Sequence, residues 1–180
     1  MTFLDMLLVG IGLSMDAVAV TIANGMAYRC KAREKVAMPL LFGGFQGLMP
    51  LLGYWAGGLF ASLIYHYAGI VTLVVLGYIG GKMLYEGLRG DDGFDVKAAL
   101  TWQVLLVQAI ATSIDAFAVG VSLLALEVQI VPACAVIAGT TFLCSLVALS
   151  LGRRFGTALG GKAKVIGGAI LLAIAIKAIL

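Results

Sequence analysis

Two aspartates in apolar surroundings are the residues of this sequence best suited to chemistry. Asp16 lies in the stretch IGLSMDAVAV, residues 11–20, and Asp115 lies in IATSIDAFAV, residues 110–119. The two stretches are identical at six of ten positions, including the aspartate. A carboxylate within a long apolar run is costly in a membrane, so it is a functional-site candidate by default. Matching places in a repeat predict one binding site shared by two halves of the chain.

A divalent cation is the ligand that two such carboxylates would neutralise. The candidate helpers near them are also oxygen donors, and oxygen ligands suit Mg, Ca and Mn better than Zn, Cu or Cd. The predicted metal site consists of Asp16, Asp115, Asn24, Gln46 and Thr112. Two alternatives stay open: each acid is protonated and hydrogen-bonded across a helix interface, and Gln46 serves only in bonding between helices.

The composition places the chain in a membrane. It is 62% hydrophobic and 12% charged, with a mean hydropathy of +1.10, whereas an ordinary soluble domain is about a quarter charged. A membrane-spanning helix needs about 20 apolar residues, and six segments qualify: 3–26, 36–62, 67–88, 100–126, 130–152 and 163–180. The second is rich in glycine and contains Pro50, which predicts a kink or a break there.

The charges of the five connections predict the orientation in the membrane. Their Lys and Arg residues number four, none, two, none and four in chain order. Under the positive-inside rule, the odd connections are cytoplasmic and both termini lie outside. Lys177, near the end of the last segment, is expected to extend to the outer headgroups. The three cysteines form no metal or redox motif, so disulfides are not expected.

The repeat predicts two inverted halves. Asp115 follows Asp16 by 99 residues, and offsets of 95 residues place Lys82 over Lys177 and Gly44 over Gly139. With three spans per copy, the second copy inserts upside down, as in many secondary transporters whose substrate sites lie between the repeats. We therefore expect an all-α membrane protein with a first three-helix repeat at 1–90, a cytoplasmic connection at 91–99 and a second, inverted repeat at 100–180.

Two other classes of protein also fit a pair of intramembrane aspartates. A passive cation channel would need the same acids but no coupling to another ion. An intramembrane aspartyl protease typically carries a GxGD motif, which this chain lacks. The chain also lacks a nucleotide-binding motif that could supply work for transport. The residues alone thus favour a secondary transporter, not an enzyme, for an oxygen-liganded divalent cation.

The sequence as a whole resembles the MntP family of bacterial manganese exporters. The resemblance rests on the doubled SxDAxAV motif, the second segment FGGFQGLMPLLGYWAG (residues 42–57) and a sixth segment rich in glycine. It implies export of Mn²⁺ from the cytoplasm across the bacterial cell membrane, with Asp16 and Asp115 needed for it; Gly25 is the family's glycine after the first motif. The chain departs from the pattern at Gln46, where some relatives carry a carboxylate.

Residues and resemblance together predict an alternating-access exporter. Mn²⁺ would be the transported substrate, with no cofactor, and protons would move in exchange. The expected partners are the metal ion, protons and the lipid bilayer of the inner membrane, and no nucleic acid.

Overall fold

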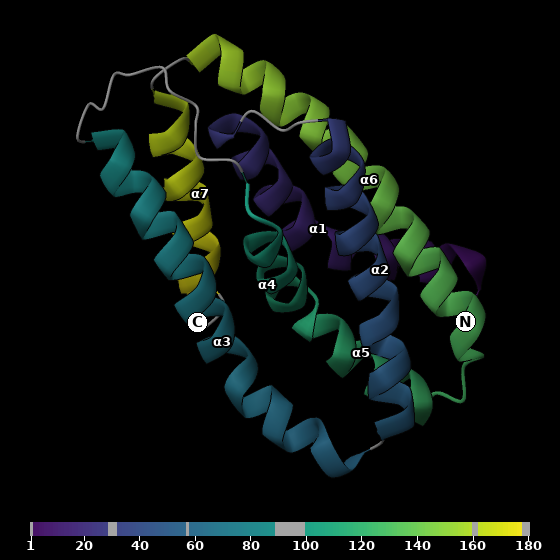
Figure 1. The fold of residues 1–180 in the computed structure, drawn as a ribbon. Coiled ribbons are helices and arrows are strands. Elements are labelled where there is room, and N and C mark those ends of the chain that lie inside the picture. The colour runs from purple at the N-terminus through teal and green to yellow at the C-terminus, as the bar shows by residue number, and fades with distance from the viewer. Residues whose placement is uncertain (1, 29–31, 57, 89–99, 160–161, 178–180) are drawn as a thin grey trace.

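The computed structural model describes residues 2–28, 32–56, 58–88, 100–159 and 162–177. Every regular element in these ranges is a helix (Figure 1), which confirms the predicted all-α class. The helices are α1 (Phe3–Ala27), α2 (Ala32–Ala56), α3 (Gly58–Leu88), α4 (Trp102–Thr112), α5 (Ile114–Ala125), α6 (Ile130–Leu159) and α7 (Ala163–Lys177). The predicted connection at 91–99 lies outside the described residues.

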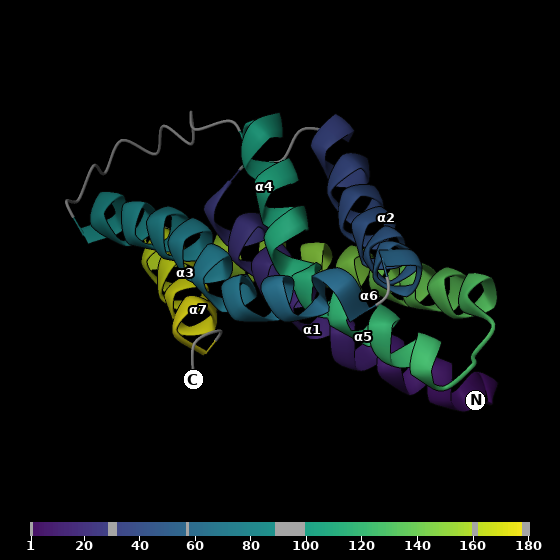
Figure 2. The same cartoon turned by 90° about the horizontal axis from the view of Figure 1, so that it is seen from below.

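The helices of the first half pack mainly on helices of the second half. The most extensive contacts join α1 to α6, α3 to α7, and α2 to both α6 and α5. Seen from below, α3 and α7 lie on one side and α2 and α6 on the other, with α4 between them (Figure 2). Contacts between α1 and α2, or between α2 and α3, are few by comparison. The interior is therefore an interface between the two halves of the chain.

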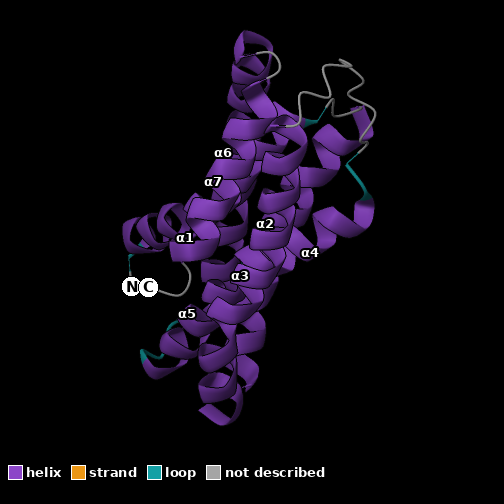
Figure 3. Cartoon of the chain, turned by 90° about the vertical axis from the view of Figure 1, so that its left-hand side faces the viewer, coloured by secondary structure: helices purple, strands orange, loops and turns teal. Residues whose placement is uncertain are grey.

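Four described stretches are long and apolar enough to cross a membrane. These are Phe3–Ala27, Ala32–Ala56, Trp102–Leu124 and Ile130–Leu159, and Val165–Lys177 is a shorter apolar helix. The view in Figure 3 shows how closely these elongated helices lie together in the bundle. The length and apolarity of these helices support a multi-pass membrane protein.

The predicted boundary between the second and third segments is wrong. We expected a loop near residues 63–66, but α2 ends at Ala56 and α3 begins at Gly58, so these residues are helical. Glycine has the lowest helix propensity of any residue except proline. One helix therefore ends at Ala56 and the next begins at Gly58, and the aromatic stretch that follows continues as a helix.

A helix break, one of the two possibilities predicted at the second segment, falls elsewhere, and the other possibility, a kink at Pro50, stays a prediction. The second segment is one helix that includes Pro39 and Pro50, whereas the fourth segment is interrupted at Ser113, between α4 and α5. There the Thr112 hydroxyl donates to the carbonyl oxygen of Gln108 at 2.9 Å, and the Ser113 N–H donates to that of Ile110 at 3.1 Å. Hydroxyl side chains compete for backbone partners and so favour helix ends.

Glycines let α1 and α6 approach closely. These two helices run parallel, because Gly10 lies beside Thr140 and, in the last turn of both helices, Met26 lies beside Gly156. A Cβ atom added at Gly152 would stand 2.5 Å from the Ile22 carbonyl oxygen. Small residues at such contacts allow van der Waals packing of membrane helices that otherwise lack a hydrophobic driving force.

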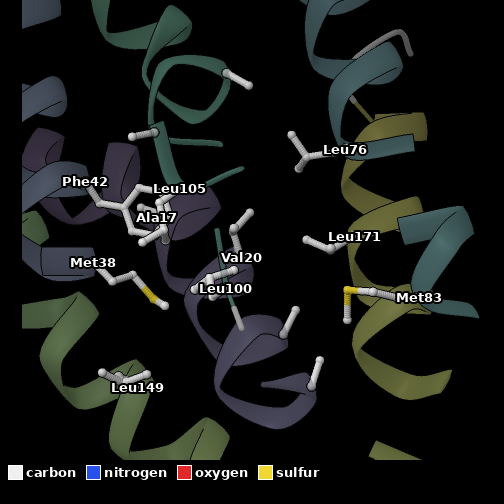
Figure 4. Packing of buried hydrophobic residues seen from close by; sticks show 14 of the residues in the cluster. Ala17, Val20, Met38, Phe42, Leu76, Met83, Leu100, Leu105, Leu149 and Leu171 are labelled. Carbon is white, nitrogen blue, oxygen red and sulfur yellow. The ribbon is translucent and has the colours of Figure 1, made fainter. Parts of the chain in front are cut away.

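A buried apolar cluster fills one end of the bundle. We call this end the basic end, because Arg33, Lys35, Arg153 and Arg154 lie there, where α1 and α6 end and α2 begins. Its buried side chains come from six helices, and Figure 4 shows several of them, including Val20, Leu76, Leu105 and Leu171. We call this set the basic-end core. It binds α1 and α4 to α3 and α7.

The close α1–α6 contact yields a stability prediction with a control on the same helix. Replacing Gly152 with Ala should destabilise the protein by about 1–3 kcal/mol, because an extra methyl must displace the α1 backbone. Replacing Gly139 with Ala should leave stability unchanged or raise it by up to about 1 kcal/mol, since no atom lies within 4 Å of that added Cβ. Denaturant titration in detergent micelles measures both. Equal stability of the two variants would contradict the prediction.

Candidate metal-binding site

The structure brings the two repeated aspartates together. Asp16 is half-buried midway along α1, and Asp115 is exposed in the first turn of α5, midway along the fourth segment. The Asp16 carboxylate is near enough to act electrostatically on Asp115. Two carboxylates on different helices thus face a common region of the bundle, as the repeat predicted.

Local structure places Asp115 at the end of a helix. Because the fourth segment breaks at Ser113, the carboxylate lies in the first turn of α5, where its Oδ1 accepts the N–H of Ala116 at 2.8 Å. The N-terminus of a helix carries a partial positive charge and free N–H groups, both of which stabilise a carboxylate. The break therefore provides a polar environment for one acid without any side chain from another helix.

Asp16 is in a different situation, in the middle of a continuous helix. Backbone N–H groups there are already bonded within the helix, and the Asp16 carboxylate makes no hydrogen bond within the described part of the chain. The described residues therefore do not show the alternative in which each acid is hydrogen-bonded across a helix interface. An apolar segment holds Asp16 without a direct partner.

Among the described residues, Lys177 is the positively charged group that acts on Asp16. It lies exposed at the end of α7, and its ammonium interacts electrostatically with the Asp16 carboxylate. The two helices run antiparallel: a Cβ atom at Gly167 would stand 3.1 Å from the carbonyl oxygen of Ala23, and from there α7 continues toward the level of Asp16. The sequence reasoning assigned Lys177 to the outer headgroups and missed this proximity. The signal available in the sequence was that the last predicted segment, 163–180, is the shortest of the six, so that its end need not reach the outer headgroups.

Gln46 lies next to the acid pair and connects two elements. Its side chain is fully buried. The Nε2 group donates to the Leu13 carbonyl oxygen at 2.8 Å, and Oε1 accepts the Ser113 hydroxyl at 2.7 Å. Gln46 therefore joins α1 to the helix break that positions Asp115. This geometry realises the alternative in which Gln46 bonds between helices, and a ligand role for its oxygen stays a prediction.

Asn24 and Thr112 use their polar atoms in hydrogen bonds that do not involve the acid pair. Asn24 lies eight residues beyond Asp16, about 12 Å along the helix axis, and exchanges two hydrogen bonds with Gln108. Thr112 is buried and its hydroxyl donates to backbone oxygens of α4. The structure thus brings Asp16, Asp115 and Gln46 together and directs Asn24 to another partner.

Any further oxygen ligands that the described residues supply to a cation at this site would have to be neutral. Among the described residues, no group of three or more His, Cys, Asp or Glu side chains could hold a metal ion. Three buried hydroxyls, on Thr21, Thr141 and Ser145, have no hydrogen-bond partner within the described ranges. The acid pair is therefore a site with two negative charges whose remaining ligands would be carbonyl, hydroxyl or water oxygens, a donor set that suits hard divalent cations.

Comparisons with known proteins agree on one family. Residues 29–179 match the family model Mntp, described as "Putative manganese efflux pump". A protein of Ruminiclostridium cellulolyticum named "Putative manganese efflux pump MntP" is 43% identical, with 98% of this chain and 95% of the relative aligned. Relatives of the same name from Clostridium perfringens and Methanosarcina mazei are each 38% identical, over 100% and 98% of this chain and 95% of each relative. No solved structure matches the chain.

The position of Gln46 yields a prediction about its role in the fold. Replacing it with Met, which has similar volume, should lower the free energy of unfolding by about 1–3 kcal/mol, because the Ser113 hydroxyl and the Leu13 carbonyl lose their partner. Gln103 is exposed on α4, so Gln103→Met is the matched control and should change little. Urea titration in micelles compares the two. If Gln46 acted only as a ligand, both variants would be equally stable in the absence of metal.

Proposed function

Because the chain belongs to the MntP family of manganese efflux pumps, we propose that it exports Mn²⁺ from the cytoplasm by alternating access, in exchange for protons. Mn²⁺ is the cargo in this proposal, and no cofactor is assigned. The protein would work in the inner membrane, with the basic end and its arginines on the cytoplasmic side. The relatives' names support manganese and efflux; the coupling and the mechanism are inferred from charge and geometry.

The observation that carries the proposal is the position of the two acids and their lack of hydrogen bonds to other helices in the described ranges. Asp16 and Asp115 lie midway along apolar segments and within electrostatic reach of one another. Neither is hydrogen-bonded to a side chain of another helix in the described ranges. Two such acids repel each other unless a cation or protons neutralise them. A divalent cation or two protons would do so equally well, which is the requirement for exchange at one site.

The exchange of two protons for one metal ion also solves an energetic problem. Moving one charge through 100 mV corresponds to about 2.3 kcal/mol, so exporting a bare divalent cation against an inside-negative potential costs roughly twice that per 100 mV. Two protons entering per Mn²⁺ make the cycle electroneutral, and the potential then no longer opposes export. The same two carboxylates can carry both ions in turn.

Alternating access is supported by how the two halves contact each other. If 1–90 and 100–180 are inverted repeats, exchanging their helices should reproduce the set of contacts. The α1–α6 contact would exchange with that between the fourth segment and α2, and the α1–α7 contact with that between α3 and the fourth segment; each of these contacts is present. The α2–α6 and α3–α7 pairs would map onto themselves. Such a bundle can rock around a site at its centre.

The proposal predicts that each aspartate is indispensable for export. Asp16→Asn and Asp115→Asn should each reduce Mn²⁺ flux to the level of membranes without the protein, because one negative charge cannot neutralise the ion. The measurement is Mn²⁺ uptake into inside-out membrane vesicles, with the protein quantified in the membrane fraction. Asp5 is exposed on the same helix, so Asp5→Asn is the control and should transport normally. Near-normal flux in Asp16→Asn or Asp115→Asn would remove the site assignment.

The coupling proposal predicts proton movement opposite to the metal. In reconstituted vesicles, Mn²⁺ flux should drive protons the other way, and an imposed pH gradient should drive Mn²⁺ uphill, because both ions use the same acids. A pH-sensitive dye and a Mn²⁺ indicator follow the two fluxes, and Asp115→Asn vesicles give the background. Flux that only runs down the metal gradient, indifferent to pH gradients, would indicate a passive channel and exclude the exchanger.

A further inference from the structure

We propose that Asn24 and Gln108 form the inner gate of the transport path, closed in this structure and opened when the site faces the cytoplasm. The inference rests on the proposed transport function but assigns a new role to the two residues. The two amides would form a latch between α1 and α4 on the basic-end side of the acid pair. In this role neither amide is a ligand of the transported ion.

The two amides are bonded to each other and fully buried. Asn24 Nδ2 donates to Gln108 Oε1 at 2.7 Å, and Gln108 Nε2 donates to Asn24 Oδ1 at 3.3 Å. Both side chains have 0% exposure, although 84 residues separate them in sequence. Asn24 is eight residues beyond Asp16 and Gln108 seven residues before Asp115, so the pair lies about 10–12 Å from the acids toward the basic end.

The helix faces that carry the acids are more deeply buried toward the basic end than toward the other end. Toward the other end of the bundle, Gly12 on α1 and Ser122 on α5 are exposed, and no atom lies within 4 Å of a Cβ built at Gly12. Toward the basic end, Val20 and Ala23 on α1 are both completely buried. Burial on these faces is thus most complete on the basic-end side of the acids, where the amide pair lies.

The proposed seal combines the basic-end core with the amide pair. Val20, Leu76, Leu105 and Leu171, from α1, α3, α4 and α7, are each 0% exposed and belong to one apolar cluster (Figure 4). A purely apolar seal would resist hydration when it opened. Amides can bond to each other when the seal is closed and to water when it is open, so a reciprocal pair within the seal suits an element with two stable states.

The corresponding positions of the other repeat carry no such pair. At the offset of 99 residues, Asn24 corresponds to Leu123 and Gln108 to Val9, both apolar. The latch is therefore confined to the basic end. An asymmetric latch of this kind would bias the empty transporter toward the outward-facing arrangement and leave the opposite gate to apolar contacts alone.

Single and double variants separate a gate from a merely structural pair. Asn24→Leu or Gln108→Met alone leaves one buried amide without a partner, which should destabilise the closed seal and open it. The double variant Asn24→Leu/Gln108→Met removes both amides, which is nearly neutral for stability, but makes hydration of the open seal unfavourable. The single variants should therefore open the gate and the double variant should hold it closed.

The measurement is thiol accessibility from the basic-end side. Cys30, Cys134 and Cys144 are replaced by Ser, and Val20→Cys places one thiol within the seal. In inside-out vesicles, a membrane-impermeant methanethiosulfonate should label this thiol on the order of tenfold faster in each single variant. It should label the double variant more slowly than the parent. Gln103→Met, on the exposed side of α4, is the control and should label like the parent.

Mn²⁺ transport gives the second readout. The double variant should insert and unfold like the parent yet transport several-fold more slowly, whereas a pair with only a structural role would transport normally in the double variant. Parent-like labelling in both single variants, or full transport in the double variant, would overturn the gate. If the single variants fail to fold, the double variant alone decides. Failure of the parent to move Mn²⁺ would contradict the proposed function, and labelling, which uses no metal, would still test the gate.

Discussion

A negative charge in the middle of an apolar segment has to be offset by positive charge or by oriented dipoles, and the chain meets this constraint differently for its two acids. Asp115 lies at the start of α5, where a break at Ser113 exposes backbone N–H groups and one of them bonds to the carboxylate. Asp16 lies within a continuous helix and has no such donors; the positive charge acting on it comes from Lys177 at the end of α7. The two copies of one motif thus sit in unlike surroundings.

Buried polar bonds join α1 to the fourth segment on both sides of these acids. Gln46 connects Leu13 of α1 with Ser113 at the helix break, and the Asn24–Gln108 pair connects α1 with α4 closer to the basic end. The acids between these two contacts remain without hydrogen bonds to other helices in the described ranges. The polar groups that hold the helices are therefore separate from the polar groups available to an ion, so that ion binding need not disrupt the scaffold.

Close packing between the two halves makes this arrangement possible. The α1–α6 contact relies on glycines at which an added Cβ would meet backbone atoms, and Gly80 and Gly168 play the same part between α3 and α7. Because each helix of the first half packs mainly on the second half, a site on α1 and α5 is also a site at the interface between halves. Movement of one half against the other would change access to the acids from either end.

The sequence by itself determined the features that depend on local patterns: an all-helical membrane protein, the membership of its family, and the pair of acids that the repeat marks as one site. Hydropathy and helical period act over about 20 residues and repeats are visible by eye, so Asp16 and Asp115 could be found without a structure. Only the tertiary structure decided which polar side chains meet. Asn24 bonds to Gln108 across 84 residues, Gln46 bonds to Ser113, and Lys177 comes within electrostatic range of Asp16. The tertiary structure also decided where a helix is interrupted. The break is at Ser113 in the fourth segment, whereas the sequence had placed a kink or a break in the second segment, at Pro50. Such pairings follow from the register and rotation of packed helices, which depend on the shape of whole interfaces and leave no periodic trace in the chain.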